Sequence, residues 1–418
     1  MRDCFADMTS GKRMNRLLQG DVGSGKTLVA AAAVWLCAQN GRQSAVMAPT
    51  ELLAQQHYRT LTKLLAPFGI RAVLLTSSMG KKARDDAKRA LREGQAHLAC
   101  GTHALLEDDV VFEHAALMVV DEQHRFGVRQ RAALAEKSND AHLLVMSATP
   151  IPRTLTLILF GDLDLSVIDE LPPGRQKIET YCVSERLRAR AYRFLNEQIE
   201  AGGQAYIVCP VIDEPEEGGK RAAATYASQL RERFPTLRIG LMHGRLKGSE
   251  KEAVMDAFRR GELDVLVSTT VVEVGVDVPN ATLMLIENAE SFGLSQLHQL
   301  RGRVGRGPRQ SYCILMQGGG GETAKQRLSA LCRESDGFRI AEEDLRLRGP
   351  GDFFGSRQHG LPDFRIADLA ADVGILQRAQ QAAAELLRRD PGLRLPESHT
   401  AALRAAAMLH TGEGAPLN

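Results

Sequence analysis

The stretch GDVGSGKT, residues 20–27, fits the pattern G-x-x-x-x-G-K-[ST] of a phosphate-binding loop. It lies between the apolar run RLLQ and an alanine-rich helical pattern, the strand–loop–helix context that such a loop requires and an ordinary glycine-rich turn does not. Glycines let backbone N–H groups turn towards phosphates, and the following helix N-terminus favours negative charge. We therefore predict that a nucleotide is bound by Gly20, Asp21, Val22, Gly23, Ser24, Gly25, Lys26 and Thr27. Lys26 is expected to contact the β- and γ-phosphates, and Thr27 to be a ligand of Mg²⁺.

On both sides of this loop, short apolar runs alternate with helical patterns between Arg16 and Leu165. Such alternation predicts a parallel sheet with helices on both faces and ligands at the carboxyl ends of the strands. A segment rich in proline and glycine, DELPPGRQKIET (169–180), interrupts the pattern, and a second series follows. We expect strands within residues 43–49, 71–77, 96–102, 116–122 and 142–149, and then within 204–212, 237–244, 263–270, 281–288 and 311–317.

The fold class predicted from these runs is α/β, with two tandem parallel-sheet domains and a mostly helical C-terminal part. The expected boundaries are residues 1–170 for the first domain, 171–180 for a linker, 181–318 for the second domain and 319–418 for the helical part. The run GGGG (318–321) marks the break before this last part.

Composition excludes several classes of protein. The formal net charge is only +2, so any nucleic-acid surface must be local. The seven cysteines include no C-x-x-C pair, which argues against a zinc site or a disulfide framework and fits a reducing compartment. The longest apolar run, residues 28–38, is too short to span a bilayer, and the N-terminus has no signal-peptide core. We expect a cytoplasmic protein that has no membrane partner.

A second acidic motif, LMVVDEQH (117–124), places two adjacent carboxylates after an apolar strand pattern. Asp121 suits coordination of Mg²⁺ beside Thr27, and Glu122 is placed to orient and polarise an attacking water. His124 could be a metal ligand, but no H-E-x-x-H pattern or nearby cysteine accompanies it, so a coupling role is the alternative that we favour.

Together these motifs resemble those of superfamily 2 helicases, whose two motor domains are RecA-like. Further matching stretches are APTELLAQQH (48–57), GTHALL (101–106), MSATPIPRTL (146–155), VSTTVVEVGVDVPNA (267–281) and QLHQLRGRVGRG (296–307). The resemblance implies ATP and Mg²⁺ as ligands, with Gly275 and Asp277 as further nucleotide contacts. It also implies that DNA contacts or coupling are provided by Thr50, Thr102, Ser147, Thr149, Arg153, His243, Arg245 and Thr269.

The arginines of QLRGRVGR (299–306) have a physical rationale of their own. Arginine supplied from another domain stabilises the charge that spreads over the γ-phosphoryl oxygens during hydrolysis. Arg303 and Arg306 match these catalytic positions, together with Lys26 and Glu122 on the other domain. A basic nucleic-acid-binding tract is the alternative, and Arg301 and Arg309 remain candidates for that role.

The amino-acid sequences of these motifs resemble those of the RecG family of bacterial branched-DNA translocases. Residues 337–369 resemble that family's translocation element, a helical hairpin followed by a loop, with Arg327 and Gln358 at the coupling positions and Arg348 helping to hold the hairpin. A helical cap that only buries core is the alternative. The resemblance implies an ATP-dependent double-stranded DNA translocase of 3′–5′ type, which remodels stalled forks and Holliday junctions in repair and recombination.

The family also carries an N-terminal wedge domain and an adenine-contacting glutamine, for which there is no room before residue 20, so we expect a C-terminal fragment or truncated product. A transcription-repair coupling-factor translocase and a non-catalytic DNA-binding fragment are the alternative functions. The former more typically has DEEQRFGV where this chain has DEQHRFGV (121–128). The resemblance further implies a monomer at the bacterial nucleoid, with branched DNA and a single-stranded DNA-binding protein as partners.

Overall fold

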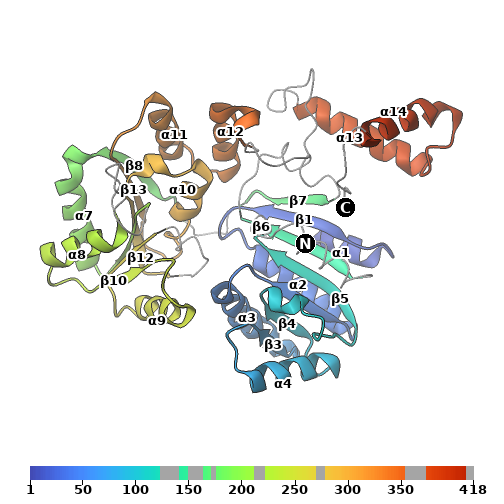
Figure 1. Ribbon diagram of the computed structural model, residues 1–418, viewed down its shortest axis with the longest axis horizontal. Helices are drawn as coiled ribbons and strands as arrows, with labels where there is room; N and C mark the ends of the chain where they lie inside the picture. The colour runs from blue at the N-terminus through green and yellow to red at the C-terminus, as the bar shows by residue number, and fades with distance from the viewer. Residues whose placement is uncertain are drawn as a thin grey trace. The chain divides into compact units, whose positions relative to one another are not determined.

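The computed structural model describes residues 1–122, 141–148, 163–170, 176–210, 222–269, 278–353 and 373–410. Seven strands form the first sheet, here called sheet A (Figure 1): β1 Asn15–Gly20, β2 Gln43–Met47, β3 Ala72–Leu75, β4 Leu98–Gly101, β5 Ala115–Asp121, β6 His142–Ser147 and β7 Asp164–Ile168. Their order is β3-β4-β2-β5-β6-β1-β7, and every pairing is parallel. In β1, Leu17 lies opposite Val145 on one side and Leu165 on the other.

Alternate residues of the sheet A strands enter two different hydrophobic clusters. One face carries Val46, Leu117 and Val119 and packs against α1 Arg2–Thr9, α2 Lys26–Gln39 and α3 Glu51–Leu65. The other face carries Ala45, Met118 and Val120 and packs against α4 Lys81–Arg92. A strand with both faces covered must be apolar at nearly every position, which is why these strands read as continuous apolar runs. The predicted helices on both faces are confirmed.

Six strands form the second sheet, sheet B: β8 Glu179–Ser184, β9 Gln204–Val208, β10 Ile239–Met242, β11 Val265–Ser268, β12 Ala281–Ile286 and β13 Tyr312–Gln317. Their order is β10-β11-β9-β12-β13-β8, and again all pairings are parallel. One face packs against α7 Arg188–Glu200 and α8 Ala223–Arg233. On the other face the ring of Tyr206 lies 4.9 Å from that of Phe258 in α9 Gly248–Arg259.

The remaining described helices are α10 Leu294–Arg301, α11 Glu322–Arg333, α12 Gly337–Phe353, α13 Val373–Arg389 and α14 His399–His410. Contacts divide the chain into two compact units, the first of which holds both sheets and extends to Ala341, while the second contains the helical residues from Glu342 onwards. The fold class predicted from sequence, two parallel-sheet α/β domains followed by helices, is therefore confirmed.

Two strands were not among those predicted. β7 and β8 each lie at the edge of a sheet, and β8 begins at Glu179, before the end of the expected linker.

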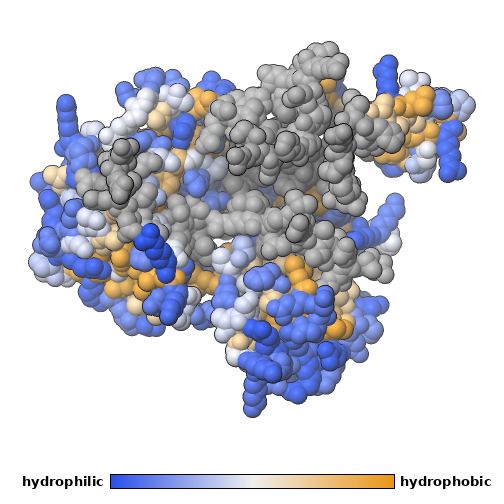
Figure 2. All heavy atoms as spheres, viewed as in Figure 1, coloured by the Kyte–Doolittle hydropathy of each residue, from blue (hydrophilic) through white to orange (hydrophobic). Residues whose placement is uncertain are grey.

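The surface around α4, whose sequence is KKARDDAKRALR, is strongly hydrophilic (Figure 2). In the described ranges, every helix is too short or too polar to span a lipid bilayer.

Candidate nucleotide-binding site

The phosphate-binding loop has the backbone that its sequence predicts. It joins the end of β1 at Gly20 to the start of α2 at Lys26. Gly23 and Gly25 have φ angles of 78° and 97°, in the left-handed region that glycine adopts without steric cost. A Cβ atom on Gly20 would lie 2.5 Å from the Oγ of Ser24, so the loop also requires glycine there for space.

Lys26 is the buried cation of this loop. Its Nζ donates hydrogen bonds to the carbonyl oxygens of Gly20, at 2.7 Å, and Asp21, at 2.9 Å. Burial lowers the pKa of Lys26, an effect that the neighbouring carboxylates Asp121 and Glu122 oppose. The ammonium group is therefore held among negative groups at the mouth of a helix, where phosphate oxygens would be stabilised.

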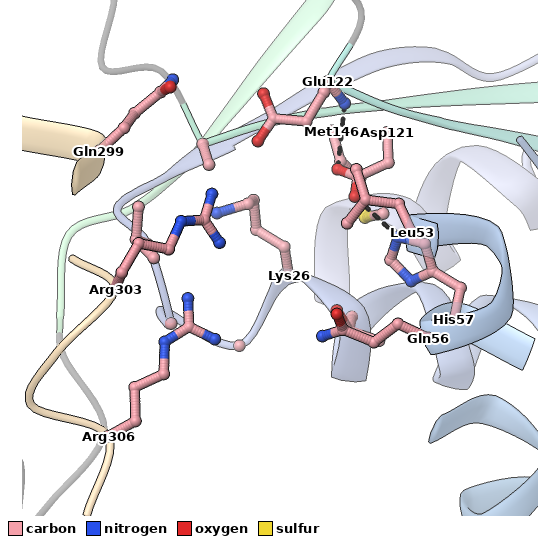
Figure 3. A pocket seen from close by; sticks show the side chains of 15 residues that line it. Lys26, Leu53, Gln56, His57, Asp121, Glu122, Met146, Gln299, Arg303 and Arg306 are labelled. Atoms are coloured by element: carbon pink, nitrogen blue, oxygen red, sulfur yellow. Dashed lines mark hydrogen bonds and ion pairs between the residues drawn. The ribbon is translucent and has the colours of Figure 1, made fainter. Parts of the chain in front are cut away.

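The acidic pair follows β5 at the carboxyl edge of sheet A. The Nε2 of His57, on α3, donates to the Oδ2 of Asp121 at 2.7 Å (Figure 3). Burial opposes ionisation of Asp121, but the His57 hydrogen bond and the Lys26 charge together hold its pKa below the usual range. Asp121 therefore presents an ionised carboxylate to the cavity.

Glu122 adopts a backbone conformation that is uncommon for a residue with a side chain, with a φ of 53°. Its N–H donates to the carbonyl oxygen of Met146, at 3.0 Å, and to the Oδ1 of Asp121, at 3.1 Å. These bonds fix the turn by which the chain leaves β5 and aim the Glu122 carboxylate into the cavity (Figure 3). Strained backbone of this kind concentrates at functional sites.

Two arginines from the sheet B side line the same cavity. Arg303 and Arg306 follow α10, and Figure 3 shows their guanidinium groups directed towards Lys26. The approach is close, because a Cβ atom on Gly302 would lie 3.0 Å from the Cβ of Val22 in the phosphate-binding loop. The cavity is lined by Val22, Gly23, Gly25, Lys26, Thr27, Leu53, Gln56, His57, Asp121, Glu122, Met146, Ala148, Gln299, Arg303 and Arg306.

The residues present fit a nucleotide with Mg²⁺. Thr27 and Asp121 offer hydroxyl and carboxylate oxygens, the hard ligands that Mg²⁺ prefers. Among the described residues no cluster of three or more His, Cys, Asp or Glu side chains could hold a metal ion alone. Mg²⁺ in nucleotide sites is bound by one or two protein ligands plus substrate phosphates and water, so this donor set is sufficient.

The candidate DNA contacts lie at the carboxyl ends of parallel strands. In sheet A, Thr50, Thr102 and Ser147 follow or end β2, β4 and β6, on the same edge as the nucleotide loop. In sheet B, His243 and Thr269 follow the neighbouring strands β10 and β11, and Arg245 is exposed just beyond. Both sheets thus carry polar residues at the carboxyl ends of their strands, and three of these residues, Thr102, Ser147 and Thr269, are buried.

Other predicted residues have different surroundings. The side chain of Arg327 donates to the carbonyl oxygen of Phe292, and Arg301, a candidate for DNA contact, has its guanidinium buried against backbone carbonyls instead. Five predicted positions lie outside the described residues: Thr149, Arg153, Gly275, Asp277 and Gln358. His124 also lies outside them.

Sequence reasoning missed two histidines that hold carboxylates of the site. His57 bonds Asp121 from 64 residues away, and His298 bonds Asp21 from 277 residues away. His57 lies in the motif APTELLAQQH (48–57) and His298 in the motif QLHQLRGRVGRG (296–307), but nothing in either motif indicates which carboxylate the histidine bonds.

Three protein-family models match the chain. They are described as DEAD/DEAH box helicase over residues 2–158, Helicase conserved C-terminal domain over residues 188–308, and ATP-dependent DNA helicase RecG, domain 3, C-terminal, over residues 334–409.

Curated relatives and solved structures agree with these models. The ATP-dependent DNA helicase RecG of Synechocystis is 51% identical over 94% of this chain and 47% of its own length. That of Bacillus subtilis is 49% identical over 95% of this chain and 58% of its own. A structure of RecG bound to a three-way DNA junction has a TM-score of 0.74 at 46% identity, covering 90% of this chain and 49% of that one. The chain thus spans about half the length of the curated relatives it matches.

Proposed function

Because this chain belongs to the RecG family of ATP-dependent DNA helicases, we propose that it hydrolyses ATP to move along branched double-stranded DNA, such as stalled forks and Holliday junctions. The observation that carries the proposal is the composition of the nucleotide cavity. One sheet contributes a phosphate-binding loop and an acidic pair, and the other contributes two arginines. Because the acidic and basic side chains of the cavity come from different sheets, hydrolysis would be linked to relative movement of the two sheets.

Each side chain has a distinct task in the proposed mechanism. Lys26 and the loop amides bind the β- and γ-phosphates, and Glu122 orients the water that attacks the γ-phosphorus. Arg303 and Arg306 stabilise the negative charge that develops on the transferred phosphoryl group. Mg²⁺ bound by Thr27 and Asp121 would neutralise charge on the phosphate oxygens. Opposed carboxylate and guanidinium groups thereby surround the reacting centre.

DNA is proposed to bind along the polar carboxyl edges of the two sheets. The Oγ1 of Thr102 and the Nδ1 of His243 are buried and have no hydrogen-bond partner in the described part of the chain. Phosphate oxygens are suitable partners for a hydroxyl or an imidazole N–H, and contacts of this kind do not read sequence. Thr50, Ser147, Arg245 and Thr269 are proposed to contribute to the same track, as are Thr149 and Arg153.

The finer properties of the family are proposed for this chain as well. They are 3′–5′ polarity, action as a monomer at the nucleoid, contact with a single-stranded DNA-binding protein, nucleotide contacts by Gly275 and Asp277, and coupling of closure to DNA movement through Arg327 and Gln358. Branched DNA as a partner is supported by the junction complex of the relative with 46% identity.

ATP turnover by the 418-residue chain tests the proposal, measured with and without a model fork beside Glu122→Gln. We expect the fork to stimulate turnover, and the substitution to reduce kcat at least about 100-fold while ATP still binds, because only the orientation of water is lost. A rate of ATP turnover that is the same with and without fork DNA would contradict the proposed action on DNA. Turnover that survives in Glu122→Gln would contradict the assigned catalytic role.

A further inference from the structure

A buried histidine connects the nucleotide loop to the helices beyond sheet B. His298 lies on α10 and is only 3% exposed. Its Nε2 lies 2.7 Å from the Oδ1 of Asp21 in the phosphate-binding loop. Its Nδ1 lies 3.0 Å from the Nη2 of Arg301, one turn along the same helix. Both ring nitrogens are therefore engaged, with partners in different parts of the molecule.

The partners determine the protonation of this ring. A guanidinium group can only donate hydrogen bonds, so Nδ1 of His298 must accept from Arg301. The proton of the neutral imidazole then lies on Nε2, which donates to the Asp21 carboxylate. The same Oδ1 of Asp21 also accepts from the N–H of Val22 at 2.6 Å. His298 is thus bonded to the carboxylate that shapes the loop backbone.

Arg301 extends this connection to the end of α11. Arg301 is 4% exposed, and its Nη1 donates to the carbonyl oxygens of Leu331, at 2.9 Å, and Glu334, at 2.7 Å. Its Nη2 also donates to the carbonyl oxygen of Ser335, at 3.0 Å. A cation at a helix C-terminus satisfies carbonyls that have no partner within the helix. Arg301 therefore fastens α10 to the segment that leads from α11 into α12.

The spacing of residues on α10 explains how this helix both contacts the phosphate-binding loop and positions Arg303. His298 and Gly302 are four residues apart and so lie on the same face, and both approach the phosphate-binding loop, at Asp21 and Val22 respectively. Arg303 follows directly. Any displacement of the last turn of α10 relative to the loop would therefore displace the arginine that lines the cavity.

We propose that His298 is a positioning residue with two tasks. It holds Arg303 and Arg306 in register with the phosphate-binding loop through Asp21, and it transmits closure of the nucleotide site through Arg301 to the end of α11. The proposal rests on the ATPase activity proposed above. It differs from a purely structural role because hydrolysis requires a donor at the Nε2 position for Asp21, whereas transmission requires both that donor and an acceptor at the Nδ1 position for Arg301.

Two substitutions separate these requirements. In His298→Gln the side-chain amide can still donate towards Asp21, whereas in His298→Asn a shorter side chain retains only an acceptor near Arg301. We expect kcat for ATP hydrolysis to fall about tenfold in His298→Asn and in His298→Ala, with less than about a threefold change in KM, and to stay within about threefold of wild type in His298→Gln. His142→Gln is the matched control, since His142 accepts from the N–H of Met14 at the start of β6, away from the cavity, and its kcat should be unchanged.

A double-substitution cycle tests whether Asp21 and His298 act together. Asp21→Ala combined with His298→Ala should be no slower than the slower single variant, because both remove the same link. Effects on kcat that multiply, or equal effects of Gln and Asn at residue 298, would overturn the positioning role. Thermal unfolding of each variant identifies any that fail to fold.

Hydrogen exchange tests transmission to α11 without requiring turnover. Addition of the non-hydrolysable analogue AMP-PNP should slow exchange of the amides between Ala330 and Ser335 in wild type, and should fail to do so in His298→Asn. Absence of slowing in wild type would overturn transmission. If fork DNA fails to stimulate turnover but the His298 variants still lower basal kcat, the proposed function is contradicted and the role of His298 is not. If wild type shows no turnover, the hydrogen-exchange comparison still tests whether closure is transmitted to α11.

Discussion

At the scale of single residues, the site is organised by pairs of acid and histidine. His57 donates to Asp121, and His298 donates to Asp21. Each histidine donates a hydrogen bond to its carboxylate and fixes the orientation of that carboxylate, which lines the cavity in Asp121 and accepts from the loop backbone in Asp21. The candidate carboxylates Asp21 and Asp121 could be predicted from their motifs, but their orientation depends on His298 and His57.

The His57 hydrogen bond should tune the affinity for Mg²⁺. In His57→Ala, Asp121 loses the donor that holds its Oδ2, and partners of this kind typically contribute about tenfold to metal affinity. We expect the Mg²⁺ concentration for half-maximal ATP turnover to rise about tenfold in a titration at saturating ATP. An unchanged Mg²⁺ requirement would show that Asp121 is oriented without His57.

At the scale of elements, the start of α2 depends on one glycine. Gly25 is the N-cap of α2, in the left-handed region, and a Cβ atom added there would meet nothing within 4 Å. Its requirement for glycine is therefore conformational and not steric. Gly11, in the turn before β1, has the same properties, with a φ of 74° and open space, but lies outside the cavity lining.

Substituting these two glycines separates stability from binding. Gly25→Ala and Gly11→Ala should each lower the free energy of unfolding by about 1–2 kcal/mol, the cost of placing an L-residue in the left-handed region. Only Gly25→Ala should also weaken nucleotide binding, because its backbone N–H belongs to the phosphate loop. Denaturant unfolding and equilibrium binding of a fluorescent nucleotide measure the two effects; equal binding losses in both variants would contradict the assignment.

At the scale of the whole described molecule, the cavity requires residues that come from two sheets. The phosphate loop and acidic pair lie on sheet A, and Arg303 and Arg306 lie on the sheet B side. Charge complementarity across the cavity is therefore a property of the two sheets together, and the hydrolysis that we propose would be coupled to their relative movement.

Arg303→Lys tests this shared site. Lysine keeps the charge but loses the planar, two-pronged geometry of a guanidinium group, so kcat should fall about 100-fold with little change in ATP binding. Arg309→Lys is the control, since Arg309 is exposed and its Nη1 donates to the carbonyl oxygen of Ala201. Retention of kcat in Arg303→Lys would mean that general positive charge is sufficient, and an equal loss in both variants would contradict a role specific to Arg303.

The predicted strands were those covered on both faces. β4 and β5 are apolar at almost every position, and β2 is apolar from Ala45 to Met47, because helices pack against both sides of these strands, so the sequence itself marks them. The edge strands β7 and β8 read DLSVI and ETYCVS, with exposed polar residues, and no apolar run marks them. The C-terminal helices were predicted in outline, since helical periodicity is local.

The sequence by itself was enough to predict the phosphate-binding loop, the acidic pair and the arginines, because each is a contiguous motif whose residue types and spacing indicate its chemistry. It also determined the parallel α/β class, through the spacing of apolar runs. Only the tertiary structure decided that His57 and His298 hold the site's carboxylates, and that Arg301 is buried at the end of α11. The physical reason is that these bonds join residues far apart in the chain, and their partners are fixed by the packing of helices onto two separate sheets.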